Sequence, residues 1–175
     1  KNGLESKVRL SKKNGQYDYP NAFSRLYANA DNKKEYYNLI FSSLSPRVTS
    51  FTGVHCKIVE AFDSYITTNY DTPIEEAFQN QFRDSKILKK YYFFCTNPQG
   101  NLTNSIVYMH GHKDIRFVII REEDYSYFYP TISGEVGAPV IEDFIKSIYL
   151  NMSIVFFGFS FTDDHIVELF RYYKK

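Results

Sequence analysis

The 175-residue sequence predicts an α/β fold, with a Rossmann-like, mainly parallel β-sheet and helices on both faces. Short apolar and β-branched runs alternate with segments of helical periodicity. One such run, residues 64–68, is followed at once by Thr72-Pro73-Ile74-Glu75, which is typical of a helix start. A strand that leads directly into a helix is half of a β-α-β unit, from which parallel sheets are built.

The first part of the chain is polar and then helical. Residues 1–17 form a polar N-terminal segment, of which residues 1–15 are expected to be a loop or frayed end. Residues 18–62 have a helical pattern, with Asp31 as the expected cap of one helix and Pro46 as its end. The apolar side of that helix would hold Tyr36, Tyr37, Leu39, Ile40 and Leu44. A further helix is expected from about residue 49 to 62.

The rest of the predicted domain, which spans residues 18–175, alternates strands and helices. Thr72 is the expected N-cap of a helix with Pro73 first and Glu75 completing a capping box. Further strands are expected at residues 91–95, 105–109, 115–120 and 153–157. Further helices are expected at residues 122–129, 139–150 and from about 160 to 172.

Composition excludes several classes of protein. The 21 basic and 20 acidic residues leave a formal charge of +1, which argues against direct nucleic-acid binding. No run reaches the ~18 to 20 apolar residues of a membrane span, so no membrane association is expected. Two cysteines without a C-x-x-C pair exclude a four-sulfur zinc site and favour a reducing, cytoplasmic location. The chain begins without Met or a signal peptide and is expected to be a piece of something longer.

Polar residues or glycines mark the ends of three predicted strands. Ligands of parallel α/β sheets bind in the crevice beyond the carboxyl ends of the strands, so these positions are candidates for one common site. The marked positions are Asn69 and Asp71, then His110 and Gly111, then Gly158 and Ser160.

Each motif also has a purely structural interpretation. Asn69 and Asp71 suit an ordinary strand-to-helix loop. Ser160 and Asp163, three positions apart before an apolar helix, suit a helix cap, and no neighbouring base makes the serine a nucleophile.

The histidines have such an interpretation too. His110 suits a strand-end turn, and His112 is expected to be solvated beside a polar loop. No metal site is expected, because these two histidines have no third clustered ligand. No glycine-rich phosphate-binding motif is present among the eight glycines.

In their order and context the motifs resemble the sirtuin-like domain of bacterial antiphage-defence proteins. The resemblance rests on Ile66-Thr67-Thr68-Asn69-Tyr70-Asp71, Tyr108-Met109-His110-Gly111 and Phe157-Gly158-Phe159-Ser160-Phe161-Thr162-Asp163. The box Glu123-Asp124-Tyr125 adds to it, and the similarity extends from about residue 18 to 172.

The resemblance implies that NAD is bound as a substrate and its nicotinamide–ribose bond is cleaved without a metal. Asn69 would order the ribose or the attacking water, and His110 would be the general base; these are the expected catalytic residues. The expected substrate-binding residues are Thr68, Asp71, Gly111, Gly158, Ser160 and Asp163. Replacing Asn69 or His110 by alanine is expected to abolish turnover and leave the melting temperature nearly intact.

Departures from the family pattern refine this hypothesis. Sirtuin deacylases resemble T-Q-N-[IV]-D at the first motif, where this chain has Thr68 and Tyr70, and the four-cysteine zinc module is absent. Both differences favour an NAD hydrolase in antiphage defence over an NAD-dependent protein deacylase. The family's first glycine-rich strand and helix have no counterpart, so the domain resembles an N-terminally truncated one. The alternative is a non-catalytic module that binds NAD or ADP-ribose or serves in assembly. The other expected partners are further copies of the chain, in a homo-oligomer, and a fused sensor domain.

Overall fold

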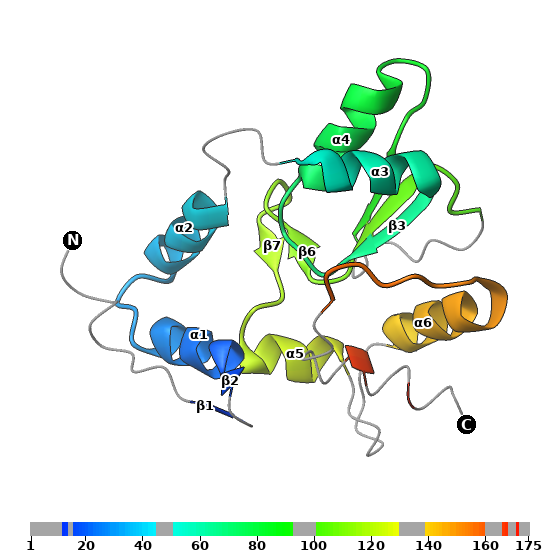
Figure 1. Cartoon of the computed structure of the whole chain (residues 1–175). Helices are drawn as coiled ribbons and strands as arrows, with labels where there is room; N and C mark the ends of the chain where they lie inside the picture. The colour runs from blue at the N-terminus through cyan, green and yellow to red at the C-terminus, as the bar shows by residue number, and fades with distance from the viewer. Residues whose placement is uncertain are drawn as a thin grey trace.

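The computed structural model describes residues 12–13, 16–44, 51–92, 101–129, 139–159, 166–167 and 171 (Figure 1). The helices are α1 (Tyr19–Ala28), α2 (Lys33–Leu44), α3 (Gly53–Ala61), α4 (Pro73–Phe82), α5 (Glu122–Phe128) and α6 (Pro139–Asn151). The strands are β1 (Lys12–Lys13), β2 (Gln16–Tyr17), β3 (Ser64–Thr67), β4 (Lys89–Tyr92), β5 (Ser105–Tyr108), β6 (Gly111–His112) and β7 (Phe117–Val118). No helix in these ranges is both long and apolar enough to span a membrane.

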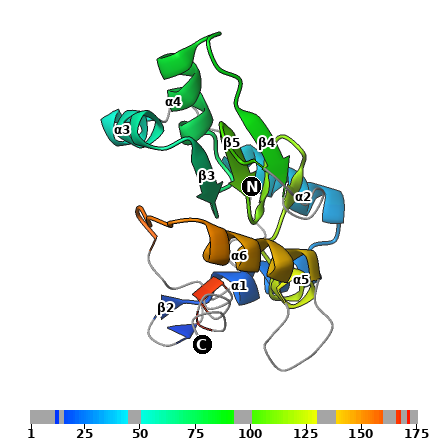
Figure 2. The same cartoon turned by 90° about the vertical axis from the view of Figure 1, so that its right-hand side faces the viewer.

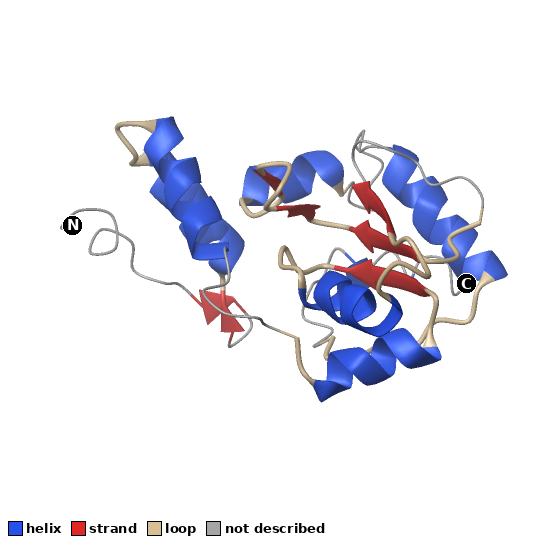
Figure 3. Cartoon of the chain, turned by 90° about the horizontal axis from the view of Figure 1, so that it is seen from above, coloured by secondary structure: helices blue, strands red, loops and turns tan. Residues whose placement is uncertain are grey.

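A three-stranded parallel sheet forms the centre of the fold, in the order β3-β5-β4. Figures 2 and 3 show these strands beside one another, with helices on both sides. The side chains of the central strand β5 alternate between the two faces: Ile106 and Tyr108 pack with α3 and α4, whereas Val107 packs with α6. All four residues of β5 are buried, which explains why Ile106, Val107 and Tyr108 follow one another without a charged or strongly polar side chain. The predicted α/β class is confirmed.

The predicted strand at 115–120 is not part of the parallel sheet. Only Phe117 and Val118 form a strand, β7, which pairs antiparallel with β6. Residues 113–116 form the turn between these two strands, and Arg116 has a left-handed φ of 53°. A connection this short reverses the chain, whereas a parallel pairing needs a crossover of about a dozen residues or more.

The strand predicted at residues 153–157 is wrong as well. The chain from 152 to 156 has no strand structure, and Val155, Phe156 and Phe157 are exposed. This segment lines one side of a cavity whose other side is β3. No described strand pairs with it, and an apolar run with high β propensity forms a strand only where a neighbour supplies the hydrogen bonds.

The N-terminal helices pack against α5 and the β7 region. A second core joins α2 to β7, and Ser24 of α1 donates a hydrogen bond to Glu123 of α5 at 2.7 Å. The helical pattern predicted for residues 18–62 is confirmed by α1, α2 and α3.

Details of this region differ from the predictions. Strand β1, which pairs with β2, lies within residues 1–15, where a loop was expected. Asn32, not Asp31, accepts the amide of Lys34 at the start of α2, because the helix begins at Lys33. Leu39 is 48% exposed, so it does not belong to the buried side of α2. Pro46 lies outside the described residues.

Candidate functional site

The first two predicted motifs follow the carboxyl ends of neighbouring strands. Thr67 at the end of β3 is paired in register with Tyr108 at the end of β5. The amide of Met109 extends this ladder by donating to the carbonyl of Thr67 at 2.8 Å. Asn69 and His110 therefore leave the sheet side by side, at the edge where α/β proteins bind ligands.

A cavity of about 320 Å³ lies beside this edge. Its walls include Thr68 and Asn69 after β3, Ile145 and Ile148 of α6, and the segment from Met152 to Phe159. Gly158 is in that segment, at a left-handed φ of 60°, and a β-carbon there would meet no atom within 4 Å. The structure thus brings Thr68, Asn69 and Gly158 together around one open space, although they are far apart in the sequence.

His110 does not line this cavity. Its side chain is 3% exposed and lies edge-on to the rings of Tyr125 and Tyr129, with centroids 5.2 and 5.6 Å away. Its Nδ1 is 3.4 Å from the hydroxyl of Tyr125. The rings of Tyr125 in α5 and Tyr129 at its C-terminal cap thus enclose the imidazole away from the cavity. The adjacent residue, Met109, does line the cavity. These tyrosines were not among the predicted site residues, although the Glu123-Asp124-Tyr125 box was noted.

Gly111 has a structural reason to be glycine. Its φ is 86°, and a β-carbon would lie 2.3 Å from the carbonyl oxygen of Phe117. The positive φ also breaks the side-chain alternation of a strand. His110 consequently faces α5, and His112 faces α4.

The prediction that His112 is solvated is wrong. Its side chain is 0% exposed and packs on the ring of Tyr108, with centroids 4.3 Å apart. Nδ1 accepts the amide hydrogen of Asp114 at 3.2 Å, and Nε2 is 3.4 Å from Oε1 of Glu75. Burial lowers the pKa of His112, with Glu75 opposing the shift. The contacts fit a neutral imidazole that carries its proton on Nε2.

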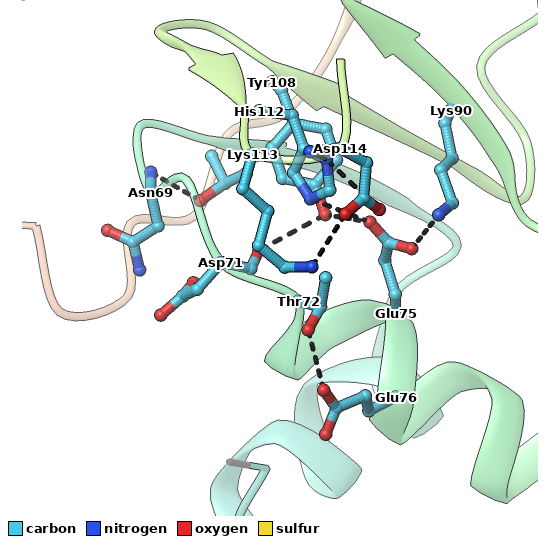
Figure 4. Close-up of polar contacts among 11 residues, drawn as sticks. Asn69, Asp71, Thr72, Glu75, Glu76, Lys90, Tyr108, His112, Lys113 and Asp114 are labelled. Carbon is cyan, nitrogen blue, oxygen red and sulfur yellow. Dashed lines mark hydrogen bonds and ion pairs between the residues drawn. The ribbon is translucent and has the colours of Figure 1, made fainter. Parts of the chain in front are cut away.

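Glu75 is the centre of a buried polar network (Figure 4). Its carboxylate accepts a hydrogen bond from the hydroxyl of Tyr108 and pairs with the ammonium of Lys90 on β4. Together with His112, these contacts join α4 to three strands. No part of this network was predicted from the sequence. The signals that pointed to it were a tyrosine at the end of a buried strand and an acidic residue two positions after Pro73.

The network also explains why the predicted capping box is absent. Thr72 and Pro73 do begin α4 as predicted, but the Thr72 side chain makes no capping hydrogen bond. Its hydroxyl donates instead to Oε1 of Glu76 at 2.7 Å. Glu75 is turned toward the sheet by Tyr108 and Lys90, so its carboxylate is engaged there rather than at the start of the helix.

Asp71 lies between the cavity edge and this network. Its backbone carbonyl is 3.4 Å from the Tyr108 hydroxyl, whereas its carboxylate projects away from Glu75 (Figure 4). Burial raises the pKa of the Asp71 carboxyl, and a backbone hydrogen bond opposes the shift. Asp71 does not line the cavity that Asn69 lines.

The remaining predicted residues, Ser160 and Asp163, lie outside the described residues. Among the residues that the structure describes, no three His, Cys, Asp or Glu side chains gather in a group that could hold a metal ion.

Comparison with known proteins identifies the family. A family model described as "SIR2-like domain" matches residues 63–175, well over half of the chain. The chain belongs to the SIR2-like domain family. The match begins one residue before β3, so it includes both strand ends and most of the residues that line the cavity of this SIR2-like domain. The sirtuin-like resemblance of the motifs is therefore confirmed.

One curated relative is similar over much of the same length. The SIR2-like domain is 30% identical over 110 residues to "NAD(+) hydrolase ThsA" of Enterococcus faecium. The alignment covers 61% of this chain and 21% of the relative, so the chain spans only about a fifth of that protein.

Proposed function

We propose that this SIR2-like domain binds NAD and hydrolyses it to nicotinamide and ADP-ribose, as part of a bacterial antiphage defence. The observation that carries the proposal is the placement of Asn69 and His110 on neighbouring strand ends, with Asn69 opening onto a cavity. Membership of the SIR2-like family and the similarity to a protein named as an NAD(+) hydrolase support the choice of substrate.

The cavity suits one part of the dinucleotide. About 320 Å³ is near the lower end of small-ligand pockets, so the site would enclose one heterocycle with its ribose rather than the whole molecule. Ile145, Ile148 and Met109 give it apolar walls for a flat ring. Thr68 and Asn69 at the strand end supply hydroxyl and amide groups for the sugar.

The reaction would need positioning more than a strong nucleophile. As the bond from ribose to nicotinamide breaks, nicotinamide leaves as a neutral amide and the ribose carbon becomes electron-poor. A water oxygen forms the new bond to that carbon, and its proton passes to a base. The Asn69 amide can accept from the water and donate to a sugar hydroxyl at once, and His110 is the proposed base.

The burial of His110 favours a second candidate function. At 3% exposure, and enclosed by tyrosine rings, its imidazole has little access to water. A domain that binds NAD or ADP-ribose as a signal, or serves in assembly, would need the cavity and Asn69 but no base.

Nicotinamide release from NAD by the purified protein, with calorimetric titration of NAD, separates these functions. A hydrolase releases nicotinamide, and Asn69→Ala abolishes the release while Asn80→Ala, on the exposed side of α4, leaves it unchanged. Binding of NAD without any release would support the sensor instead. If the protein neither binds NAD nor releases nicotinamide, the hydrolase is refuted, and so is a domain that binds NAD as a signal.

A further inference from the structure

The loop that carries Asn69 is attached to the same hairpin as His110. The amide of Lys113 donates to the carbonyl of Tyr70 at 3.5 Å, and the hydroxyl of Tyr70 donates to the carbonyl of Ile119 at 2.7 Å. The amide of Ile119 in turn donates to the carbonyl of His110 at 2.8 Å. The distance between the two proposed catalytic residues is therefore set by how this loop sits on the β6–β7 hairpin.

A third attachment, from Tyr108, depends on Glu75. The Tyr108 hydroxyl lies between the carbonyl of Asp71 and the carboxylate of Glu75, and its ring is 0% exposed. Burial, reinforced by the neighbouring Glu75 carboxylate, raises the pKa of Tyr108 far above its ordinary value. The group is thus a permanent O–H donor, and Glu75 determines where that donor points.

Burial of the Glu75 carboxylate costs hydration free energy, so packing alone does not explain why a glutamate stands at this position. The Glu75 side chain is only 12% exposed, and a carboxylate taken out of water is stabilising only when its partners replace the lost hydration. Glu75 has two such partners, Lys90 and Tyr108, and Nε2 of His112 lies 3.4 Å from its carboxylate. An apolar side chain would fill this place between α4 and the sheet without that requirement, but it would remove the hydrogen bond that joins the first turn of α4 to the end of β5.

We propose that Glu75 and Tyr108 are positioning residues, which hold the Asn69–Asp71 loop in register with the strand end that carries His110. The proposal rests on the proposed function for its catalytic consequence. Neither residue lines the cavity, so neither would touch the substrate there. Their effect would be exerted through the first turn of α4, which follows Asp71 in the chain and is held at the end of β5 by the hydrogen bond from Tyr108 to Glu75.

Four variants test this role. Tyr108→Phe keeps the ring contacts with His112 and Tyr92 but loses the hydroxyl. Glu75→Leu removes the acceptor, whereas Glu75→Gln keeps an amide oxygen for Tyr108. Glu76→Gln, at the neighbouring position of the same helix turn, where the carboxylate accepts a hydrogen bond from the Thr72 hydroxyl, is the matched control.

The kinetic result expected is a loss of kcat with little change in KM. Displacement of a reacting group by about 1 Å costs up to ~100-fold, so Tyr108→Phe and Glu75→Leu should lower kcat about ten- to a hundredfold. Glu75→Gln should restore most of the rate, and Glu76→Gln should match the parent protein. A rate in Glu75→Gln as low as in Glu75→Leu would overturn the role of the hydrogen bond.

Amide hydrogen exchange tests the positioning without any reaction. In Tyr108→Phe, the amides of Asn69 and Lys113 should exchange at least ~10-fold faster, while the Met109 amide of the sheet ladder stays protected. Unchanged protection of Asn69 and Lys113, or equal loss at Met109, would overturn the proposal. If the parent protein releases no nicotinamide, the proposed function fails, and the exchange result still decides whether these residues position the loop.

Discussion

The imidazole of His112 and the carboxylate of Glu75 face each other inside the protein, with Nε2 3.4 Å from Oε1. His112 is 0% exposed, and its Nδ1 already accepts the amide hydrogen of Asp114. Protonation at Nδ1 would break that hydrogen bond and place a buried positive charge near Lys90, whose ammonium pairs with Glu75. Burial and the hydrogen bond from Asp114 thus favour the neutral histidine, and the Glu75 carboxylate opposes them.

This relationship predicts a loss of stability in mild acid. Because the pKa of His112 is lowered from 6.5, mainly by burial, the folded protein binds fewer protons than the unfolded chain just below pH 6.5. The free energy of unfolding should therefore fall as the pH drops from 6.5 to the lowered pKa, and then level off. Urea unfolding between pH 8 and pH 5 measures this slope, and His112→Gln should flatten it. Parallel curves for the two proteins would contradict the prediction.

Gly111→Ala should be strongly destabilising. The added methyl would lie 2.3 Å from the Phe117 carbonyl oxygen, and alanine would also have to adopt a φ of 86°. Together these effects should cost about 2 to 4 kcal/mol of unfolding free energy. Gly158→Ala is the matched control, because its φ is also positive but the space around it is open, and it should cost about 1 kcal/mol. Equal losses in urea unfolding would show that the contact with Phe117 does not matter.

Ile106→Ala tests the importance of the central strand. Ile106 is 1% exposed between β5 and the helices α3 and α4, so removing its side chain should cost about 2 to 5 kcal/mol. Ile87 is 81% exposed, and Ile87→Ala should change the unfolding free energy by less than about 0.5 kcal/mol. A similar small loss in both variants would mean that the parallel sheet is not the centre of stability.

Elements with local signals were predictable from the sequence. The continuous apolar run of β5 and the Thr72-Pro73 start of α4 both depend on neighbouring residues, and both were placed correctly. Residues 115–120 and 153–157 have equally strong β propensity, but whether such a run becomes a strand depends on a partner elsewhere in the chain. The periodicity of the sequence contains no information about that partner.

In the candidate site, too, local features were predictable from the sequence, whereas contacts between distant segments were not. The first two motifs located the ends of β3 and β5, and parallel pairing explains why Asn69 and His110 emerge side by side, whereas the third motif follows no described strand. The burial of His112 and the turn of Glu75 toward Tyr108 follow from the positive φ of Gly111 and from contacts between α4 and the sheet. The contacts of Glu75 with Tyr108 and His112 join residues more than thirty positions apart, which no local pattern specifies.

The structure changes what alanine substitutions at the two proposed catalytic residues should do. Asn69 is exposed at the cavity, so Asn69→Ala should leave the melting temperature within about 1 °C. His110 is enclosed by Tyr125 and Tyr129, so His110→Ala leaves a void and should cost about 1 to 3 kcal/mol, or about 3 to 10 °C. We therefore expect a nearly intact melting temperature for Asn69→Ala and a lowered one for His110→Ala.

This difference determines how loss of activity is interpreted. A drop in nicotinamide release in His110→Ala reports on folding as well as chemistry, whereas the same drop in Asn69→Ala reports on the site. His110→Gln fills more of the space between the tyrosines and is the better test of the base. The expected result is a folded protein, checked by its melting curve, that binds NAD in calorimetry and releases no nicotinamide. Parent-level release from His110→Gln would show that the imidazole takes no proton in the reaction.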